Sequence, residues 1–376
     1  MRKNIANRFR TNDFDIPTET AELVFRELSL AEEIEDAKRD AFGRRQIEHS
    51  LSRYDRSTPA IDYIINQIPK SSKTPKTSWP DSRPYAICLT HDMDYAGPLF
   101  RLRGILTAAR RSISGVGSKN MAFQNALRSA FGPYKERASL DRFLDIEQSF
   151  DCKSTIFCWA GSFGKEHVCD CDYRMNDPIR YNGSAVSVKK ALQRMSESGM
   201  DIGLHAGITS SISPESLKMQ KSYLEKSIGS EVKSVRFHYL SYDSLITPGV
   251  ISCAGFSNDS TVGYSSNAGF RAGTSFPFFL WDWQTSSSTD VLEFPLHVMD
   301  VAIMRQQTDC TTRCLEMLDA VRKTGGCLNL LWHTDADEKR WTLYETILRR
   351  AKDQGAWLCT IKEANDWWRQ HIQSLE

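Results

Sequence analysis

The segment Tyr85–Asp94, which reads YAICLTHDMD, determines how the rest of this chain is interpreted. It begins with an apolar run that predicts a buried strand, and the carboxylates Asp92 and Asp94 stand at the carboxyl end of that run. Burial of an unpaired carboxylate costs several kcal/mol, so both side chains should face open solvent or a metal ion. Because the functional groups of α/β folds gather at this edge of the sheet, the segment predicts an α/β protein with a polar site there.

After Pro84 the chain alternates between strand and helix patterns. Helical patterns end at glycines, as at Gly199 and Gly229, because glycine readily adopts the left-handed conformation that ends a helix. The predicted strands are 85–91, 154–160, 200–205, 232–240, 327–333 and 357–361, and the predicted helices include 140–150, 311–323, 340–353 and 362–373. Strands that alternate with helices of this length indicate a parallel sheet, either open or closed into a barrel.

The start of the chain has a different character. Residues 1–80 predict a helical extension in front of an α/β domain that spans 84–372. Ser29 and Glu32 form a capping-box pattern ahead of one helix of this extension. Inside the α/β domain, the basic segment 100–137 has only weak helical patterns and is interpreted as a solvated face.

The composition excludes several classes of protein. The 376 residues carry a formal net charge of +1, which argues against a dedicated nucleic-acid surface. Hydrophobic residues make up 40% of the chain, but no apolar run is long enough to span a bilayer. The basic residues Arg2 and Lys3 are followed by no apolar run, so we expect no signal peptide and a cytoplasmic protein. The sequence predicts no particular oligomeric state.

Ten cysteines are scattered along the chain, several of them inside predicted strands. This distribution suits reduced, buried thiols better than a disulfide framework. Cys169 and Cys171 are the one close pair in the sequence. A C-x-C pair without a second such pair is weak evidence for zinc, so we interpret these two residues as ordinary thiols.

Three further predicted strands end in histidine, at His205, His238 and His333. In a parallel sheet they would converge with Asp92 and Asp94 on one edge, although they are far apart in sequence. A single histidine in such a place is more often a hydrogen-bonded core residue, but three of them beside a D-x-D pair are hard to explain in that way. One carboxylate and two or three imidazoles form the ligand set of a catalytic divalent metal, most simply Zn²⁺. The remaining carboxylate and histidine could then serve as base and acid.

These motifs resemble, in the same order, those of the polysaccharide deacetylase (NodB-like, carbohydrate esterase) superfamily over about residues 84–370. The similar stretches are Leu89–Asp94, Ser154–Phe157, Asp201–His205, Arg236–Tyr239 and Leu330–His333. The T-H-D-x-D form of the first motif resembles a subgroup found with bacterial surface-polysaccharide biosynthesis. Residues 268–273 and 294–300 are also similar to that subgroup.

The resemblance implies a distorted (β/α) barrel and a metal-dependent hydrolase that removes N-acetyl groups from a sugar. By position, Asp92 corresponds to the general base and Asp94 to the metal-binding carboxylate. His205 corresponds to the first metal-binding histidine and His333 to the general acid. A member of the family without a signal peptide would act on a nucleotide-linked or lipid-linked acetamido sugar.

Arg236 and Tyr239 complete the machinery that the resemblance implies. The guanidinium of Arg236 would orient Asp92 through charge-assisted hydrogen bonds. The backbone N–H of Tyr239 would be offered to the oxyanion that forms during amide hydrolysis.

The chain departs from the family pattern after His205. The family has a second metal-binding histidine four residues later, where this chain has Thr209. His238 stands where the family usually has proline and is our candidate for the replacement ligand. His91 is the second candidate, although strand alternation points it away from Asp92.

The tryptophan–aspartate motif that supports the catalytic histidine of the family is also altered. Asn258–Ser260 or Trp281–Trp283 could supply its carboxylate, and we favour Asp259. Arg271, which follows a glycine-containing turn, either binds a carboxylate or phosphate of the substrate or caps a loop.

Two other functions stay open at this point. A related hydrolase could act on another linear or cyclic amide C–N bond. Because the metal ligands are altered, the chain could also be a catalytically inactive scaffold of the same fold. Release of acetate from an acetamido sugar would distinguish the predicted deacetylase from both.

Overall fold

The structure is a computed structural model, and it describes residues 18–35, 39–40, 42, 44, 56–67, 79–96, 139–160, 167–306 and 309–373. The basic segment 100–137, which the sequence indicates as a solvated face, lies outside the described residues.

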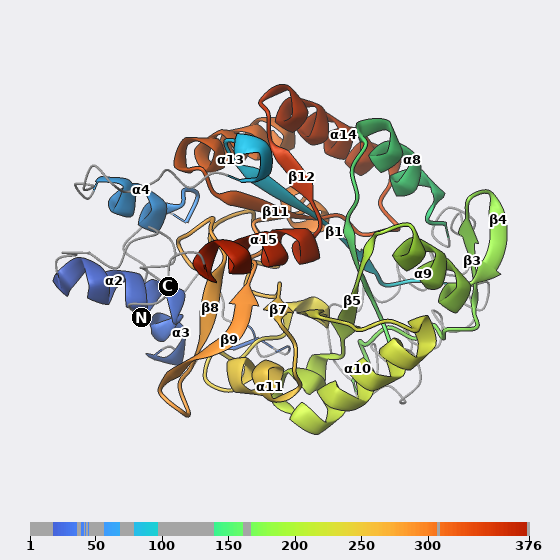
Figure 1. Ribbon diagram of the computed structural model, residues 1–376, viewed down its shortest axis with the longest axis horizontal. Helices are drawn as coiled ribbons and strands as arrows, with labels where there is room; N and C mark the ends of the chain where they lie inside the picture. Colours follow the sequence, from blue (N-terminus) through green and yellow to red (C-terminus); the bar gives the residue numbers. More distant parts are fainter. Residues whose placement is uncertain are drawn as a thin grey trace.

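The centre of the protein is a curled sheet, to which the described residues contribute ten strands. Its curvature is visible in Figure 1. Nine strands follow one another in the order β10-β11-β1-β2-β5-β6-β7-β9-β8, and β12 also pairs with β1. Their bounds are β1 Ala86–Met93, β2 Thr155–Cys158, β5 Asp201–Ala206, β6 Ser234–Phe237, β7 Asn258–Asp259, β8 Phe278–Asp282, β9 Ser287–Glu293, β10 Val298–Met299, β11 Cys327–Leu331 and β12 Trp357–Cys359. All neighbouring pairs are parallel except β8 and β9. The predicted α/β fold with a distorted barrel is confirmed.

Helices surround this sheet on its outer side, except that α15 lies across the middle of the curled sheet in this view (Figure 1). They are α8 Asp141–Phe150, α9 Val188–Glu197, α10 Pro214–Ile228, α11 Thr247–Cys253, α12 Asp300–Ile303, α13 Cys310–Thr324, α14 Glu338–Asp353 and α15 Ile361–Gln373, with a small hairpin of β3 Pro178–Tyr181 and β4 Ser184–Ser187. The ends of α10 follow from local chemistry, since the Ser213 side chain accepts a hydrogen bond from the Ser216 N–H and Gly229 ends the helix at φ 80°.

The predicted strand 232–240 is too long. The observed strand β6 ends at Phe237, and residues His238–Leu240 form the short 3-10 helix η4. Tyr239 and Leu240 have φ values of 59° and 54°, which a strand cannot contain. The sequence pattern that predicted the strand therefore extends beyond β6 into the turn His238–Leu240, and this turn shapes the site.

Strand β1 is buried on both faces, and its side chains alternate between two parts of the core. Ile87 and Leu89 belong to the large apolar cluster that includes residues of the surrounding helices. Ala86 and Cys88 belong to a second cluster inside the curled sheet, where Trp368 of α15 also packs. Asp92 follows Cys88 by four residues, so both side chains lie on the same face of β1. The carboxylate of Asp92 therefore points toward the interior of the curled sheet.

The described part of the extension consists of helices α2 Thr18–Leu28, α3 Ala31–Glu35 and α4 Ala60–Gln67. It is joined to the rest of the protein by buried polar contacts. Glu33 of α3 accepts two hydrogen bonds of 2.7 Å from the Arg271 guanidinium. Asp62 of α4 accepts hydrogen bonds from the Ser275 N–H at 2.9 Å and the Thr274 hydroxyl at 2.6 Å. The division at residues 1–80 and 84–372 stays a prediction.

Two expectations about this region can be compared with the structure. Arg271 is buried and pairs with Glu33, and its Nη1 donates to the Gly263 carbonyl at 3.1 Å, which favours the loop-capping alternative over a substrate anion. Ser29 does not stand next to α3, since Leu30 lies between them, and its hydroxyl contacts the Arg26 carbonyl of α2. The partner of Arg271 is a tertiary contact, and Ser29, in the turn after α2, contacts a carbonyl of that helix. The local sequence pattern predicts neither of these contacts.

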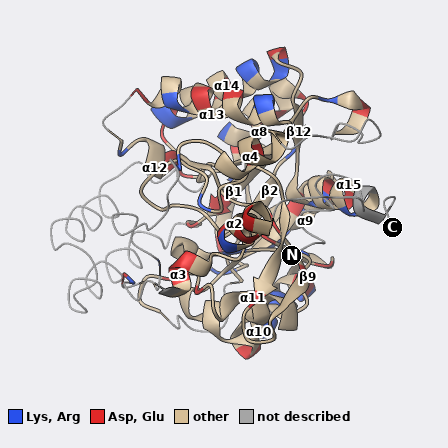
Figure 2. Cartoon of the chain, turned by 90° about the vertical axis from the view of Figure 1, so that its left-hand side faces the viewer, with Lys and Arg blue, Asp and Glu red and all other residues tan. Residues whose placement is uncertain are grey.

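The surface charges are mixed in sign. Figure 2 shows acidic and basic residues interspersed along the outer helices α13 and α14. Among the described residues, no helix combines the length and the apolar character that are needed to cross a bilayer.

Candidate active site with a metal-binding group

The carboxyl ends of β1, β5 and β6 bring the predicted site residues together. Parallel pairing places His205 of β5 beside Arg236 of β6, and His238 follows directly after β6. Asp92 lies near the end of β1, and Asp94 follows the strand. The spatial convergence that the sequence predicts is therefore present in the structure.

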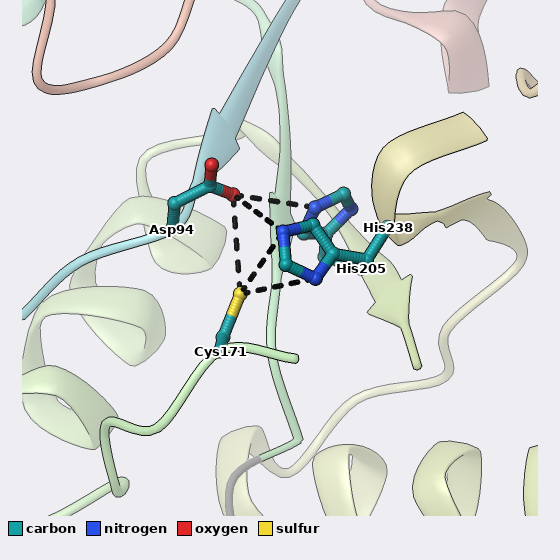
Figure 3. Close-up of side chains that lie close together, drawn as sticks. All are labelled: Asp94, Cys171, His205 and His238. Carbon is teal, nitrogen blue, oxygen red and sulfur yellow. Dashed lines mark hydrogen bonds and ion pairs between the residues drawn. The ribbon is translucent and has the colours of Figure 1, made fainter. Parts of the chain in front are cut away.

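Four side chains of this edge form a group that could hold a metal ion: Asp94, Cys171, His205 and His238 (Figure 3). One ligand atom from each residue lies within 4.8 Å of the other three. Asp94 Oδ1 is 3.3 Å from His205 Nε2 and 3.9 Å from His238 Nε2. The Cys171 Sγ is 3.9 Å from the same oxygen and 4.0 Å from His238 Nε2. Carboxylate, imidazole and thiolate ligands in this number suit Zn²⁺.

The two imidazoles are oriented by neighbours on the side away from Asp94. His205 Nδ1 is 3.2 Å from the backbone carbonyl of Arg236, which leaves Nε2 facing Asp94. His238 Nδ1 is 3.7 Å from the carboxylate of Asp170. Metal-binding histidines commonly have such a partner on the second nitrogen, because it fixes the orientation of the ring.

The electrostatics favour the metal-binding forms of Asp94 and His238, whereas for His205 the carboxylates of Asp92 and Asp94 outweigh burial and raise the pKa of the imidazole. Burial alone would raise the pKa of Asp94, but the hydrogen bond with His205 and the charges of His238 and His333 hold that pKa well below its usual range. Burial lowers the pKa of His238 and so favours the neutral imidazole. An ionised carboxylate and a neutral imidazole are the species that coordinate a cation.

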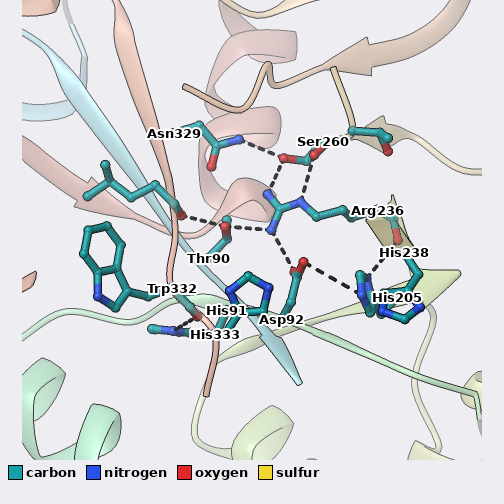
Figure 4. Close-up of polar contacts among 12 residues, drawn as sticks. Thr90, His91, Asp92, His205, Arg236, His238, Ser260, Asn329, Trp332 and His333 are labelled. Carbon is teal, nitrogen blue, oxygen red and sulfur yellow. Dashed lines mark hydrogen bonds and ion pairs between the residues drawn. The ribbon is translucent and has the colours of Figure 1, made fainter. Parts of the chain in front are cut away.

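Arg236 fixes the orientation of Asp92 (Figure 4). Its guanidinium is fully buried and donates to Asp92 Oδ1 at 2.9 Å, to the Thr90 hydroxyl at 2.9 Å and to the Ser260 carbonyl at 2.8 Å. The other carboxylate oxygen, Asp92 Oδ2, lies 3.8 Å from His205 Nε2. The contact that the resemblance implies between Arg236 and Asp92 is therefore present, and it leaves one oxygen of Asp92 facing the metal-binding group.

His333 contacts the other oxygen of Asp94. Its Nε2 is 3.8 Å from Asp94 Oδ2, and its Nδ1 is 2.6 Å from Asp300 Oδ1. Arg340 donates to the second oxygen of Asp300 at 2.8 Å. Burial would lower the pKa of His333, but the charge of Asp300 raises it to about 10.

The carboxylate that supports His333 is therefore Asp300 and not Asp259, which the sequence favoured. Asp259 accepts a hydrogen bond from Thr261 at 2.6 Å and lies against Glu293. Asp282, the alternative, accepts hydrogen bonds within its own turn. Asp300 ends the stretch 294–300 that resembles the subgroup, but no periodic pattern of the chain distinguishes it.

His91 is not part of the metal-binding group. Its Nδ1 is 2.8 Å from the Trp332 carbonyl and its Nε2 is 2.8 Å from Glu147 of α8. It therefore points away from Asp92, as strand alternation predicts. Because it holds the residue that precedes His333, its contact supports the backbone next to the site.

Tyr239 occupies a strained turn at the site. Its backbone is left-handed at φ 59° and ψ 15°, which is unfavourable for a bulky residue. Phe42 stacks on its ring with centroids 4.3 Å apart, and Arg44 donates to its carbonyl at 2.9 Å. The sequence predicts no chemistry for the extension, because no local pattern links these two residues to Tyr239.

Cys171 is a second contribution to the site that the sequence pattern does not predict. It is buried, and the neighbouring Asp170 fixes its loop by accepting hydrogen bonds from the Ile208 N–H at 2.9 Å and the His167 N–H at 3.0 Å. The sequence interprets Cys171 as an ordinary thiol, and the structure places its sulfur beside Asp94 and His238. The C-x-C pair is the one signal of this role in the sequence.

Known structures share this architecture. No family model matches the chain, and no curated protein matches its sequence. A structure from Mycobacterium smegmatis that is assigned as a polysaccharide deacetylase has a TM-score of 0.53 and 17% identity, covering 82% of this chain and 97% of that chain. One from Pseudomonas aeruginosa PAO1, assigned in the same way, has a TM-score of 0.52 and 14% identity, covering 80% and 95%. This chain has the polysaccharide-deacetylase fold.

The same fold also carries a different activity. The structure of Puue allantoinase has a TM-score of 0.52 and 14% identity to this chain, covering 80% of this chain and 97% of that one. At these identities the similarity establishes the fold alone. The activity of this polysaccharide-deacetylase fold therefore has to be argued from the residues at its site.

Proposed function

We propose that this protein is a metal-dependent hydrolase that removes N-acetyl groups from a sugar in surface-polysaccharide biosynthesis. One observation carries the proposal. The metal-binding group around Asp94 lies between two oriented proton-transfer groups, Asp92 held by Arg236 and His333 held by Asp300. Amide hydrolysis needs this combination, since a water must lose a proton and the leaving amine must gain one.

Asp94, His205 and His238 would hold the metal ion, with Zn²⁺ as the most suitable cation for these donors. A cation held there would polarise the acetamide carbonyl and make water more acidic. His238 takes the role that the family pattern gives to a histidine at the position of Thr209. Thr209 lies in the 3-10 helix η3 Ile208–Ile212 and is not a member of the metal-binding group.

Asp92 acts as the general base in this proposal. Its Oδ1 is engaged by Arg236, so Oδ2, on the side of His205, accepts the proton of the attacking water. The buried guanidinium stabilises the ionised carboxylate until the proton arrives. Because Arg236 is itself held by Thr90 and Ser260, the base is held in one orientation.

His333 acts as the general acid. Although burial opposes the charged form, Asp300 raises the pKa of His333 to about 10, so the imidazole is protonated at neutral pH. Its Nδ1–H donates to Asp300, so Nε2 holds the proton that passes to the leaving nitrogen as the C–N bond breaks. The products are acetate and the free amino sugar. The backbone N–H of Tyr239 would stabilise the oxyanion of the tetrahedral intermediate.

The substrate that we propose is an acetamido sugar linked to a nucleotide or a lipid, used in the cytoplasm. Its support is the resemblance of the T-H-D-x-D motif and of residues 268–273 and 294–300 to proteins of surface-polysaccharide biosynthesis. The catalytic domain would span 84–372, and the extension 1–80 would contribute Phe42 and Arg44 beside Tyr239.

The experiment is an acetate-release assay with the zinc-loaded protein. Nucleotide-linked and lipid-linked acetamido sugars form one panel, and linear and cyclic amides such as allantoin form the other. We expect acetate from the sugar panel alone. Hydrolysis of a cyclic amide without acetate release would instead favour the second candidate function, which the shared fold with an allantoinase supports. Turnover of neither panel would favour an inactive scaffold.

A further inference from the structure

Cys171 brings a thiol into a site whose other donors are a carboxylate and two imidazoles. Its sulfur lies 3.9 Å from Asp94 Oδ1 and 4.0 Å from both ring nitrogens of His238. Figure 3 shows the side chain pointing from its loop toward the other three residues. We infer that the Cys171 thiolate is a fourth ligand of the metal ion, which makes the site a His₂-Asp-Cys centre. This inference rests on the proposed metal site.

The distances fit a tetrahedral centre after a small contraction. Zinc bonds of about 2.0 to 2.3 Å place neighbouring ligand atoms roughly 3.3 to 3.6 Å apart in a tetrahedron. The pair Asp94 Oδ1 and His205 Nε2 is already at 3.3 Å. The separations of Asp94 Oδ1 from His238 Nε2 and from Cys171 Sγ are both 3.9 Å, and that between Cys171 Sγ and His238 Nε2 is 4.0 Å. These three separations therefore have to shorten by only a few tenths of an ångström, and the ligand atoms of His238 and Cys171 each lie within 4.8 Å of that of His205.

The surroundings of Cys171 differ from those of other buried cysteines. Cys158 and Cys314 lie in the large apolar cluster, where burial raises the pKa of each thiol and keeps it unreactive. Cys171 belongs to the same cluster, but its sulfur also faces polar atoms of Asp94 and His238. Apolar packing alone does not require a thiol to contact these polar atoms, so the position of the sulfur indicates a further role.

The loop that carries Cys171 is fixed to the same ligand set. Asp170 binds the Ile208 and His167 backbone N–H groups, and its carboxylate lies 3.7 Å from His238 Nδ1. One residue therefore anchors the loop and orients a ligand, while the next residue supplies the sulfur. The contacts of Asp170 therefore both orient His238 and place Cys171 in the site.

A thiolate ligand changes which metal the site prefers. Thiolates are soft ligands that select Zn²⁺ and related ions, whereas carboxylate and water ligands suit Mg²⁺ and Mn²⁺. Four protein ligands would fill the four positions that zinc commonly uses, so a substrate oxygen would need either an additional position or that of the sulfur.

The test uses the full-length protein, stripped of metal with a chelator and reloaded with Co²⁺. We expect a near-ultraviolet thiolate-to-cobalt charge-transfer band in the unaltered protein. Cys171→Ser should remove the band and lower the affinity for Zn²⁺ on the order of 10- to 100-fold in a competition titration. Cys169→Ser is the matched control, and it should leave both the band and the affinity unchanged.

A second measurement needs no variant. X-ray absorption of the zinc-loaded, unaltered protein should show one sulfur neighbour at about 2.3 Å. The inference is overturned if that sulfur is missing, or if the cobalt protein lacks the band although Asp94→Ala abolishes cobalt binding. In that case the proposed function still stands on three ligands. If the unaltered protein binds neither Zn²⁺ nor Co²⁺, the metal-dependent function fails together with this inference.

Discussion

His333 Nδ1 and Asp300 Oδ1 lie 2.6 Å apart, and this pair links the carboxyl end of β11 to the start of α12. Arg340 of α14 donates to the second oxygen of Asp300 at 2.8 Å. The carboxylate is completely buried between the imidazole and the guanidinium. Asp300 of α12, held by Arg340 of α14, thus sets the orientation and charge of His333, the proposed general acid.

Asp300→Asn should lower kcat by about 10²- to 10⁴-fold, since the neutral amide no longer stabilises the imidazolium of His333. Steady-state acetate release measures this effect. Asp282→Asn changes a carboxylate that accepts hydrogen bonds from its own turn, away from His333, and should leave kcat unchanged. Equal losses in the two variants would contradict the role of Asp300.

Asp92→Asn should lower kcat by about 10²- to 10⁴-fold without loss of metal, because the amide cannot accept the proton of water. The ligands Asp94, His205 and His238 are unchanged in this variant. Acetate release and the zinc content of the purified protein are measured together. Full activity of the variant would rule out Asp92 as the base.

His238→Ala should weaken Zn²⁺ binding at least on the order of 10- to 100-fold, since it removes a proposed direct ligand and leaves Asp170 without its imidazole neighbour. A competition titration against a chromophoric chelator measures the affinity. His297→Gln changes a buried histidine that is not a member of the metal-binding group and serves as the control. If His238→Ala binds Zn²⁺ with unaltered affinity, His238 is not a ligand and another residue takes that position.

Arg271→Ala should lower the free energy of unfolding by about 3–5 kcal/mol, because it leaves the buried carboxylate of Glu33 without its bidentate partner. Urea unfolding measures the loss. The double change Glu33→Leu and Arg271→Met should recover most of it, since no buried charge remains unpaired. A rise in KM without loss of stability would instead restore the idea that Arg271 binds the substrate.

His297 should make the stability fall as the pH is lowered. Burial lowers its pKa from 6.5 to about 4, and the neutral ring accepts from the Asn329 N–H while its Nε2 lies 3.2 Å from the Thr274 carbonyl. A depressed pKa gives stability that is present above pH 6.5 and is lost as the pH falls toward 4. The slope of this single group is at most about 1.4 kcal/mol per pH unit. His297→Gln should reduce the slope in urea unfolding between these values, and an unchanged slope would contradict this assignment.

Much of the fold could be predicted from local patterns. The apolar run before Asp92, the glycines that end helices and the alternation of strands and helices are short-range features, and each matches an observed element. The convergence of Asp94, His205 and His238 could also be predicted, because parallel strands bring their carboxyl ends to one edge of the sheet. Alternation along β1 likewise separates His91 from Asp92.

The remaining features depend on contacts between segments that no periodic pattern connects. The sequence by itself determined six strands of the sheet, the parity of β1 and the histidines at the strand ends, because these follow from backbone geometry within a few residues. The strands β7, β8, β9 and β10 are not among those it predicts. Only the tertiary structure decided that Asp300 and not Asp259 supports His333, that Arg271 pairs with Glu33 and that Cys171 joins the metal-binding group. Loops and turns supply these partners, and where a loop places its side chains depends on the packing of the whole fold.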